Sequence, residues 1–281
     1  MRGAPVTAAA GSITSAHLRR GSPVWAFGAG AAIGLLGGLI GLGGAEFRLP
    51  LLIALFGFVA LEAVILNKAM SLVVVIAALP ARAFAVPWEQ VASHWSVVVN
   101  LLAGSLLGAW VAAGWATRMH SRTLYRVLAV LLVLIALVLA STHYADLGGV
   151  DLPPLPRAVA GVIAGVLIGM VAAFMGVAGG ELLIPTIVLL FAVDIRLAGS
   201  LSLMVSLPTM VVAFARYSRD STFAVIGQNI RFVLLMGGGS IAGAVAGGAL
   251  LRYVASPALI AVLALILLIS AAKVWRHTDH H

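Results

Sequence analysis

The sequence predicts an all-α polytopic membrane protein that is built from two inverted repeats. Hydrophobic residues make up 62% of the chain and charged residues 9%, whereas soluble domains contain about 45–50% and about 25%. Several apolar runs exceed the ~20 residues that a helix needs to cross a bilayer. A glycine-rich motif with a following proline interrupts one apolar run in each half of the chain. Two short or broken helices of this kind are expected to meet at the bilayer midplane.

The charge and the cysteine count exclude several classes of protein. The net charge is +8 and the chain contains no cysteine. In a membrane protein the basic residues mostly record orientation, so the positive charge does not indicate a nucleic-acid partner. Without cysteine there are no disulfides and no thiolate metal sites. We expect no cofactor and no metal, and the short loops carry no nucleophile–base pair that would indicate an enzyme.

The first half follows a polar tail at residues 1–21, which we interpret as cytoplasmic because the apolar run after it is too long for a signal peptide. The first repeat, residues 22–142, contains five apolar segments: Val24–Gly44, the short Phe47–Ala60, Leu61–Val86, Ala92–Thr117 and Leu124–Ala140. The short segment is about 21 Å long as a helix, against a hydrocarbon core of about 30 Å. It can cross only with help from the irregular stretch before it.

The second half repeats this order after a linker at residues 143–157, which contains three prolines. The second repeat, residues 158–276, contains Ala158–Val177, the short Leu182–Val193, Leu197–Tyr217, Phe232–Leu251 and Pro257–Trp275. Residues 277–281 form a C-terminal tail. The halves therefore have the same sequence of long and short apolar segments, which predicts one architecture for both.

The glycine-rich motif occurs at Gly41–Pro50 and again at Gly176–Pro185. An offset of 135 residues pairs the following positions: Gly41 with Gly176, Gly44 with Gly179, Glu46 with Glu181, Pro50 with Pro185, Asn67 with Ser202, and Ser71 with Ser206. Because the register never shifts between the early and the late pairs, we interpret the repeat as a gene duplication.

The basic loops predict the topology. Arginines gather in the connections 117–126 and 216–231, and further basic residues lie in both tails. All four sets lie on the cytoplasmic side if each half crosses the membrane five times, with the short segments counted as crossings. An odd number of crossings inverts the second half relative to the first. If the short segments turn back instead, each half crosses four times and one basic set lies outside.

The candidate binding site follows from what lipid forbids. Irregular backbone at membrane depth must line a cavity inside the protein, so the glycines of both motifs are expected to face inward. Each short helix begins just after its glycines, and a helix N-terminus attracts anions. The predicted substrate-binding residues come from the two motifs and from the helices that follow them: Gly43, Gly44, Arg48, Asn67, Ser71, Gly179, Gly180, Ser202 and Ser206.

Glu46 and Glu181 are the predicted proton-coupling residues. Burial and a neighbouring anion both disfavour an ionised carboxylate, so a proton would bind as the anion enters. The alternative is that each carboxylate only caps its own helix. Arg48 corresponds to the apolar Leu183, so it provides a single cation, either for a bound anion or as an ion-pair partner of Glu181.

The paired glycine-rich motifs and their prolines, in a duplicated membrane protein that extends from Val24 to Trp275, resemble the sulfite exporter TauE/SafE family. The resemblance implies a secondary transporter in the bacterial inner membrane that exports sulfite, an organosulfonate or another small sulfur-containing anion. In the form usual for the family, the positions of Glu46, Arg48 and Glu181 are apolar. This difference indicates a distinct subgroup.

Other functions remain open at this point. One alternative is a passive anion channel, and another is a cation carrier that uses the paired glutamates as ligands. A structural or assembly protein of the membrane is a third. The expected partners are a small anion and the lipid bilayer, with no nucleic acid, and the sequence is compatible with a homodimer.

Overall fold

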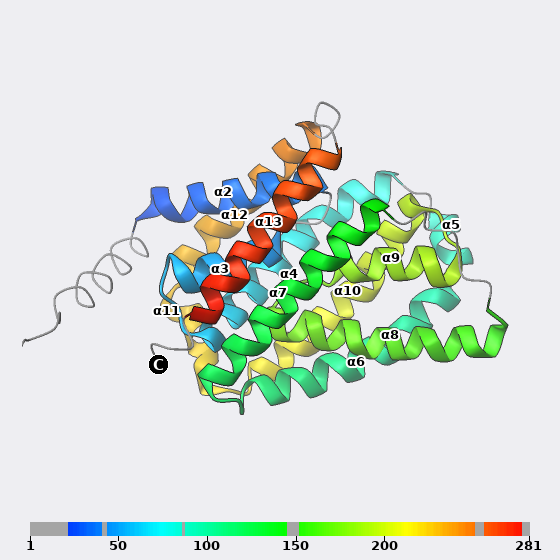
Figure 1. Ribbon diagram of the computed structural model, residues 1–281, viewed down its shortest axis with the longest axis horizontal. Coiled ribbons are helices and arrows are strands. Elements are labelled where there is room, and N and C mark those ends of the chain that lie inside the picture. Colours follow the sequence, from blue (N-terminus) through cyan, green and yellow to red (C-terminus); the bar gives the residue numbers. More distant parts are fainter. Residues whose placement is uncertain (1–21, 41–43, 86–87, 145–151, 251–255, 277–281) are drawn as a thin grey trace, which may run out of the picture.

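The computed structural model describes residues 22–40, 44–85, 88–144, 152–250 and 256–276 (Figure 1). Within these ranges the regular structure is helical and no strand occurs. Five of the described helices contain stretches that are long and apolar enough to cross a membrane: Ala60–Ala77, Trp95–Ala116, Pro154–Met175, Leu197–Tyr217 and Ile230–Gly247. The prediction of an all-α polytopic membrane protein is confirmed.

The order of helices is the same in both halves. The first half contains α2 (Pro23–Ile40), α3 (Ala45–Ala54), α4 (Ala60–Ala85), α5 (Trp88–Ser93), α6 (Trp95–Ala116) and α7 (Ser121–Tyr144). The second contains α8 (Pro154–Met175), α9 (Gly180–Phe191), α10 (Ile195–Tyr217), the 3₁₀ helix η1 (Ser221–Ala224), α11 (Val225–Gln228), α12 (Ile230–Leu250) and α13 (Ser256–Arg276). Helices α3, α4, α6 and α7 begin 135 residues before α9, α10, α12 and α13 respectively. The predicted offset is therefore present in the helix boundaries.

The two halves pack against each other through exchanged helices. Helix α2 of the first half lies alongside α12 of the second, and α8 of the second lies alongside α6 of the first (Figure 1). A Cβ atom added at Gly30 would lie 2.1 Å from the backbone oxygen of Met236. One added at Gly165 would lie 2.5 Å from the backbone oxygen of Leu101. The second pair is the first with the halves exchanged at the same offset, as a two-fold relation produces.

This close approach explains why the crossing helices are rich in glycine. Any side chain at these positions would meet the backbone of the opposite helix, and small residues allow membrane helices to approach closely. The exchange of contacts supports a two-fold relation between the halves. That the second half is inverted across the membrane stays a prediction.

The distribution of polarity is that of a protein surrounded by lipid. Large apolar side chains point outward on several helices: Leu107 is 64% exposed, Leu167 58% and Leu234 63%. The side chains of Arg48 and Lys68 are fully buried. Helices α7 and α13 pack against each other on one side of the bundle, while α4 and α10 pack against each other in its interior (Figure 1). The ionisable side chains at membrane depth are thus enclosed by helices.

The predicted segments differ from the observed helices in two ways. Helix α8 begins at Pro154, four residues before the predicted start of the second repeat, and α7 continues to Tyr144, into the predicted linker. Proline is favoured in the first turn of a helix, because the N–H that it lacks has no partner there. The helices α5, η1 and α11 were not predicted, because four to six residues are too few to show a helical period.

Candidate functional site

Two left-handed glycines start the short helices. Gly44 precedes α3 with φ of 69°, and Gly179 precedes α9 with φ of 81°. Other residues adopt this conformation only with strain, which accounts for glycine at both positions. The carbonyl of Gly44 accepts hydrogen bonds from the backbone N–H groups of residues 47 and 48, and that of Gly179 from residues 182 and 183. Gly180 is the first residue of α9, while Gly43 lies outside the described residues.

The glutamates bring the two short helices together. Glu46 and Glu181 are each the second residue of their helix. Their carboxyl groups lie within hydrogen-bonding reach of one another, and each also interacts with the backbone N–H of its own residue. The Oε2 atom of each is buried without a hydrogen-bond partner. The carboxyl groups therefore form a pair between the halves. That they couple transport to protons stays a prediction.

The prolines of the two short helices leave the backbone carbonyl groups of the glutamates without their usual helical hydrogen bond. Pro50 and Pro185 lie inside α3 and α9, four residues after the glutamates. A proline has no N–H to donate to the carbonyl of the residue four positions earlier. The backbone carbonyls of Glu46 and Glu181 are thus released from the helical hydrogen-bond pattern in both halves.

Arg48 lies in α3 and is completely buried. Its Nη1 atom donates to Oδ1 of Asn67 at 3.4 Å and to Oγ of Ser71 at 3.3 Å, both on α4. Its Nε and Nη2 atoms are buried and have no hydrogen-bond partner. Buried polar groups are nearly always hydrogen-bonded, so unpaired guanidinium donors mark a place where a further acceptor would fit.

Two side chains of α4 donate hydrogen bonds to the backbone next to the short helices. The Nδ2 atom of Asn67 donates to the backbone oxygens of Ala45 at 3.0 Å and Met175 at 2.9 Å, so it joins the start of α3 to the end of α8. The Nζ atom of Lys68 donates to the backbone oxygens of Ala172 at 2.7 Å and Val177 at 2.8 Å. Both side chains belong to the first half, and both donate hydrogen bonds to backbone oxygens of the second half where α8 ends.

Lys68 is a buried residue of this cluster that the site prediction from the sequence did not include. The cation that interacts with Glu181 is Lys68, whereas Arg48 interacts with Glu46. The alternative in which Arg48 pairs with Glu181 is therefore not the arrangement found. An ionisable residue inside a transmembrane segment is by default a candidate for function, and that signal could have identified Lys68.

The polar residues of α10 are buried, but they are not hydrogen-bonded to Arg48 or to the glutamates. Ser202 donates to the backbone oxygen of Gly199 in its own helix at 2.9 Å, and the hydroxyl of Ser206 is buried without a partner. Helix α10 packs against both α4 and α9. The structure thus places Ser202 and Ser206 in the interior, while no hydrogen bond recorded for them reaches Arg48 or the glutamates.

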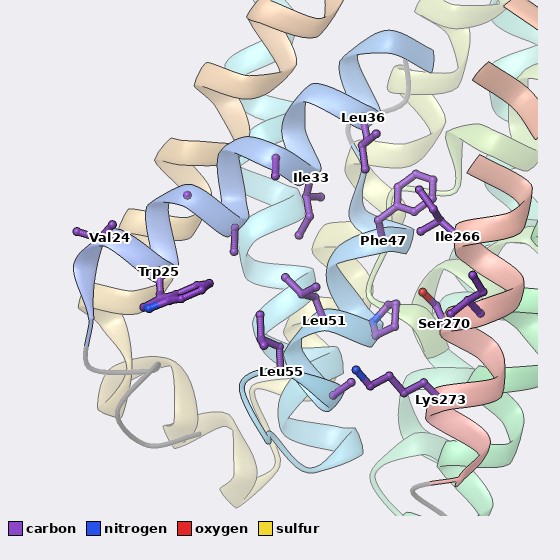
Figure 2. A pocket seen from close by; sticks show the side chains of 16 residues that line it. Val24, Trp25, Ile33, Leu36, Phe47, Leu51, Leu55, Ile266, Ser270 and Lys273 are labelled. Carbon is purple, nitrogen blue, oxygen red and sulfur yellow. The ribbon is translucent and has the colours of Figure 1, made fainter. Parts of the chain in front are cut away.

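A pocket of about 700 Å³ lies between α2, α3 and α13 (Figure 2). Its lining is largely apolar and includes Phe47 and Pro50 of α3, with Lys273 of α13 at one end. None of the predicted site residues that the structure describes lines it. The polar chemistry therefore lies in a cluster of five buried residues and the partly buried Glu181, which we call the polar centre. The buried residues are Glu46, Arg48, Asn67, Lys68 and Ser71.

Comparison with known proteins identifies a family for the first half. The family model described as Sulfite exporter TauE/SafE matches residues 4–139. This confirms the resemblance that the motifs predict, over the part of the chain that contains α2 to α6 and most of α7. Searches of curated proteins and of solved structures gave no match. The match and the apolar helices together indicate a multi-pass membrane protein whose first half is similar to the sulfite exporter family.

Proposed function

We propose that the protein is a proton-coupled secondary transporter that exports a small sulfur-containing anion, such as sulfite or an organosulfonate. The observation that carries this proposal is the buried guanidinium of Arg48, whose Nε and Nη2 atoms have no partner. It lies one turn into α3, two residues after Glu46. The match to the sulfite exporter family supports the class of substrate.

Arg48 supports an anion because of its geometry as well as its charge. A guanidinium presents a rigid planar set of donors that suits the oxygens of an oxyanion. The N-terminus of α3 adds the positive end of a helix dipole. Sulfite and sulfonate groups carry several oxygens on one sulfur, so one molecule can accept from both unpaired nitrogen atoms of Arg48.

The cation-carrier alternative is weaker because the two carboxyl groups are not the only charges present. Arg48 and Lys68 are buried in the same centre and interact with Glu46 and Glu181 respectively. A metal cation would have to approach two fixed positive charges in a region of low dielectric, where repulsion is strong. The same two cations favour an anion.

The passive-channel alternative is weaker because most of the polar centre is enclosed. Glu46 is 1% exposed, Ser71 is 3% exposed, and Arg48, Asn67 and Lys68 are not exposed at all. An enclosed centre between two short helices suits a carrier that opens to one side at a time. The contact between the two carboxyl groups supports proton coupling, because neighbouring carboxylates cannot both ionise cheaply.

The proposal is tested by transport in proteoliposomes. Purified protein would be assayed for the flux of sulfite, sulfoacetate, taurine-derived anions and divalent cations, with and without a pH gradient. We expect flux of a sulfur-containing anion that a pH gradient accelerates. Arg48→Ala should abolish most of this flux, whereas Arg118→Ala, which removes an exposed arginine, should not. Flux of divalent cations with no anion flux would overturn the proposal.

A further inference from the structure

We infer that the transported anion is monovalent and that it crosses the membrane together with one proton, which Glu46 and Glu181 share. This inference rests on the proposed function and specifies the charge of its substrate. It follows from the charges of the polar centre and from the atoms that lack partners there. Hydrogen sulfite and simple monosulfonates fit this class, whereas sulfate, sulfite dianion and sulfocarboxylates do not.

The carboxyl pair supplies the proton site. Glu46 and Glu181 reach each other across the boundary between the halves, and Glu46 is 1% exposed. Two carboxylates in contact repel strongly, and the usual solution is that one proton is held between them. The hydrogen bond then has one protonated oxygen as donor and one ionised oxygen as acceptor. In that form the pair carries a single negative charge.

The cations outnumber that charge by one. An arginine side chain stays protonated in proteins, so Arg48 contributes one positive charge. Lys68 donates to two carbonyl oxygens at 2.7 and 2.8 Å, and an ammonium group, which has three donors and no acceptor, suits such partners. Among the side chains whose burial the structure describes, no other Asp, Glu, Lys or Arg is buried. The buried hydroxyl of Tyr217, which donates to the backbone oxygen of Ala173, is neutral.

One monovalent anion balances the remaining positive charge. It would accept hydrogen bonds from the free Nε and Nη2 atoms of Arg48, and the loaded centre would then be neutral. Without the shared proton, the same anion would leave one negative charge uncompensated in a region of low dielectric. The single shared proton leaves a net charge of +1, so a dianion would leave one negative charge uncompensated in the centre.

The net movement is therefore one proton and one monovalent anion, with no net charge. The test uses sulfonates because they stay ionised at every working pH. Proteoliposomes would be loaded with methanesulfonate, which has one charge, or with 1,2-ethanedisulfonate, which has two. Efflux would be measured at zero membrane potential and at 100 mV of either sign, together with proton flux.

We expect methanesulfonate efflux to be insensitive to the membrane potential, with one proton moved per anion and with disulfonate at least tenfold slower. If one net charge moved, 100 mV would change the equilibrium accumulation of the anion about 50-fold. Such a change, or disulfonate flux equal to that of methanesulfonate, would overturn the inference while leaving the anion carrier intact. Absence of flux for both sulfonates and for sulfite would overturn the proposed function as well.

The variant Glu181→Gln adds an independent readout. The remaining carboxylate of Glu46, with Arg48 and Lys68, gives the same net positive charge without any proton. Methanesulfonate efflux should then become sensitive to the membrane potential and insensitive to pH. The control is Glu62→Gln, whose carboxylate accepts from the backbone N–H of Val59 at 3.3 Å near the start of α4. Efflux by this variant should stay electroneutral. Electroneutral, pH-dependent efflux in Glu181→Gln would contradict the shared proton.

Discussion

The crossing of α2 and α12 predicts a sharp difference between two neighbouring glycines. A Cβ atom at Gly239 would lie 2.3 Å from the backbone oxygen of Phe27, which is 1.1 Å closer than the 3.4 Å at which ordinary contact begins. A Cβ atom at Gly238 would have nothing within 4 Å. Overpacking of this kind costs about 1–3 kcal/mol. Both changes to alanine gain a similar helix propensity, up to about 1 kcal/mol, so propensity cancels in the comparison.

We therefore expect Gly239→Ala to be less stable than Gly238→Ala by about 1–3 kcal/mol. Thermal or denaturant unfolding in mixed micelles, followed by far-UV circular dichroism, would measure the difference. Gly104→Ala provides a second test on α6, since its Cβ atom would lie 2.0 Å from the backbone oxygen of Val162. The packing argument is refuted if Gly239→Ala is as stable as Gly238→Ala.

Three further predictions concern topology and the polar centre. Because the natural chain has no cysteine, a single introduced cysteine is the only site that a thiol reagent labels. With an impermeant reagent, Ser93→Cys should react from outside the cell and Ser218→Cys only from inside. Labelling of both variants from the same side would contradict five crossings per half. Arg48→Ala should weaken anion binding about 10- to 150-fold, because hydrogen bonds to a charged group contribute about 1.5–3 kcal/mol; equal loss in Arg118→Ala, measured by the same titration, would show a nonspecific effect. Asn67→Leu should lower the free energy of unfolding by about 1–3 kcal/mol in the same unfolding assay, because it leaves buried carbonyl oxygens unpaired. Unchanged stability would show that the hydrogen bonds from Asn67 to Ala45 and Met175 do not stabilise the fold.

The helical architecture could be predicted from the sequence because its signals are local. Apolar runs, the glycines before Glu46 and Glu181, and the prolines after them determine where helices start and break. The constant offset of 135 residues predicted the correspondence of helices between the halves, and four pairs of helix starts confirm it. The short helices near the loops were missed because they have no apolar period.

The sequence prediction included every residue of the polar centre except Lys68, but it did not include the contacts between them. Symmetry pointed to both glutamates, but their mutual contact depends on how two short helices approach in space. The role of Lys68 could not be predicted from nearby residues, because its acceptors at Ala172 and Val177 are more than 100 positions away. Asn67 likewise donates to the backbone oxygens of Ala45 and Met175, which lie far apart in the chain.

The most direct test of the account is calorimetric titration of the purified protein with methanesulfonate at several pH values. The account predicts that one proton is taken up with each anion, so the affinity should fall as the pH rises, approaching tenfold per pH unit once the carboxyl pair is deprotonated in the free protein. Glu46→Gln and Glu181→Gln should bind with an affinity that does not depend on pH. Binding by the natural protein that is independent of pH, or that strengthens as the pH rises, would contradict the account.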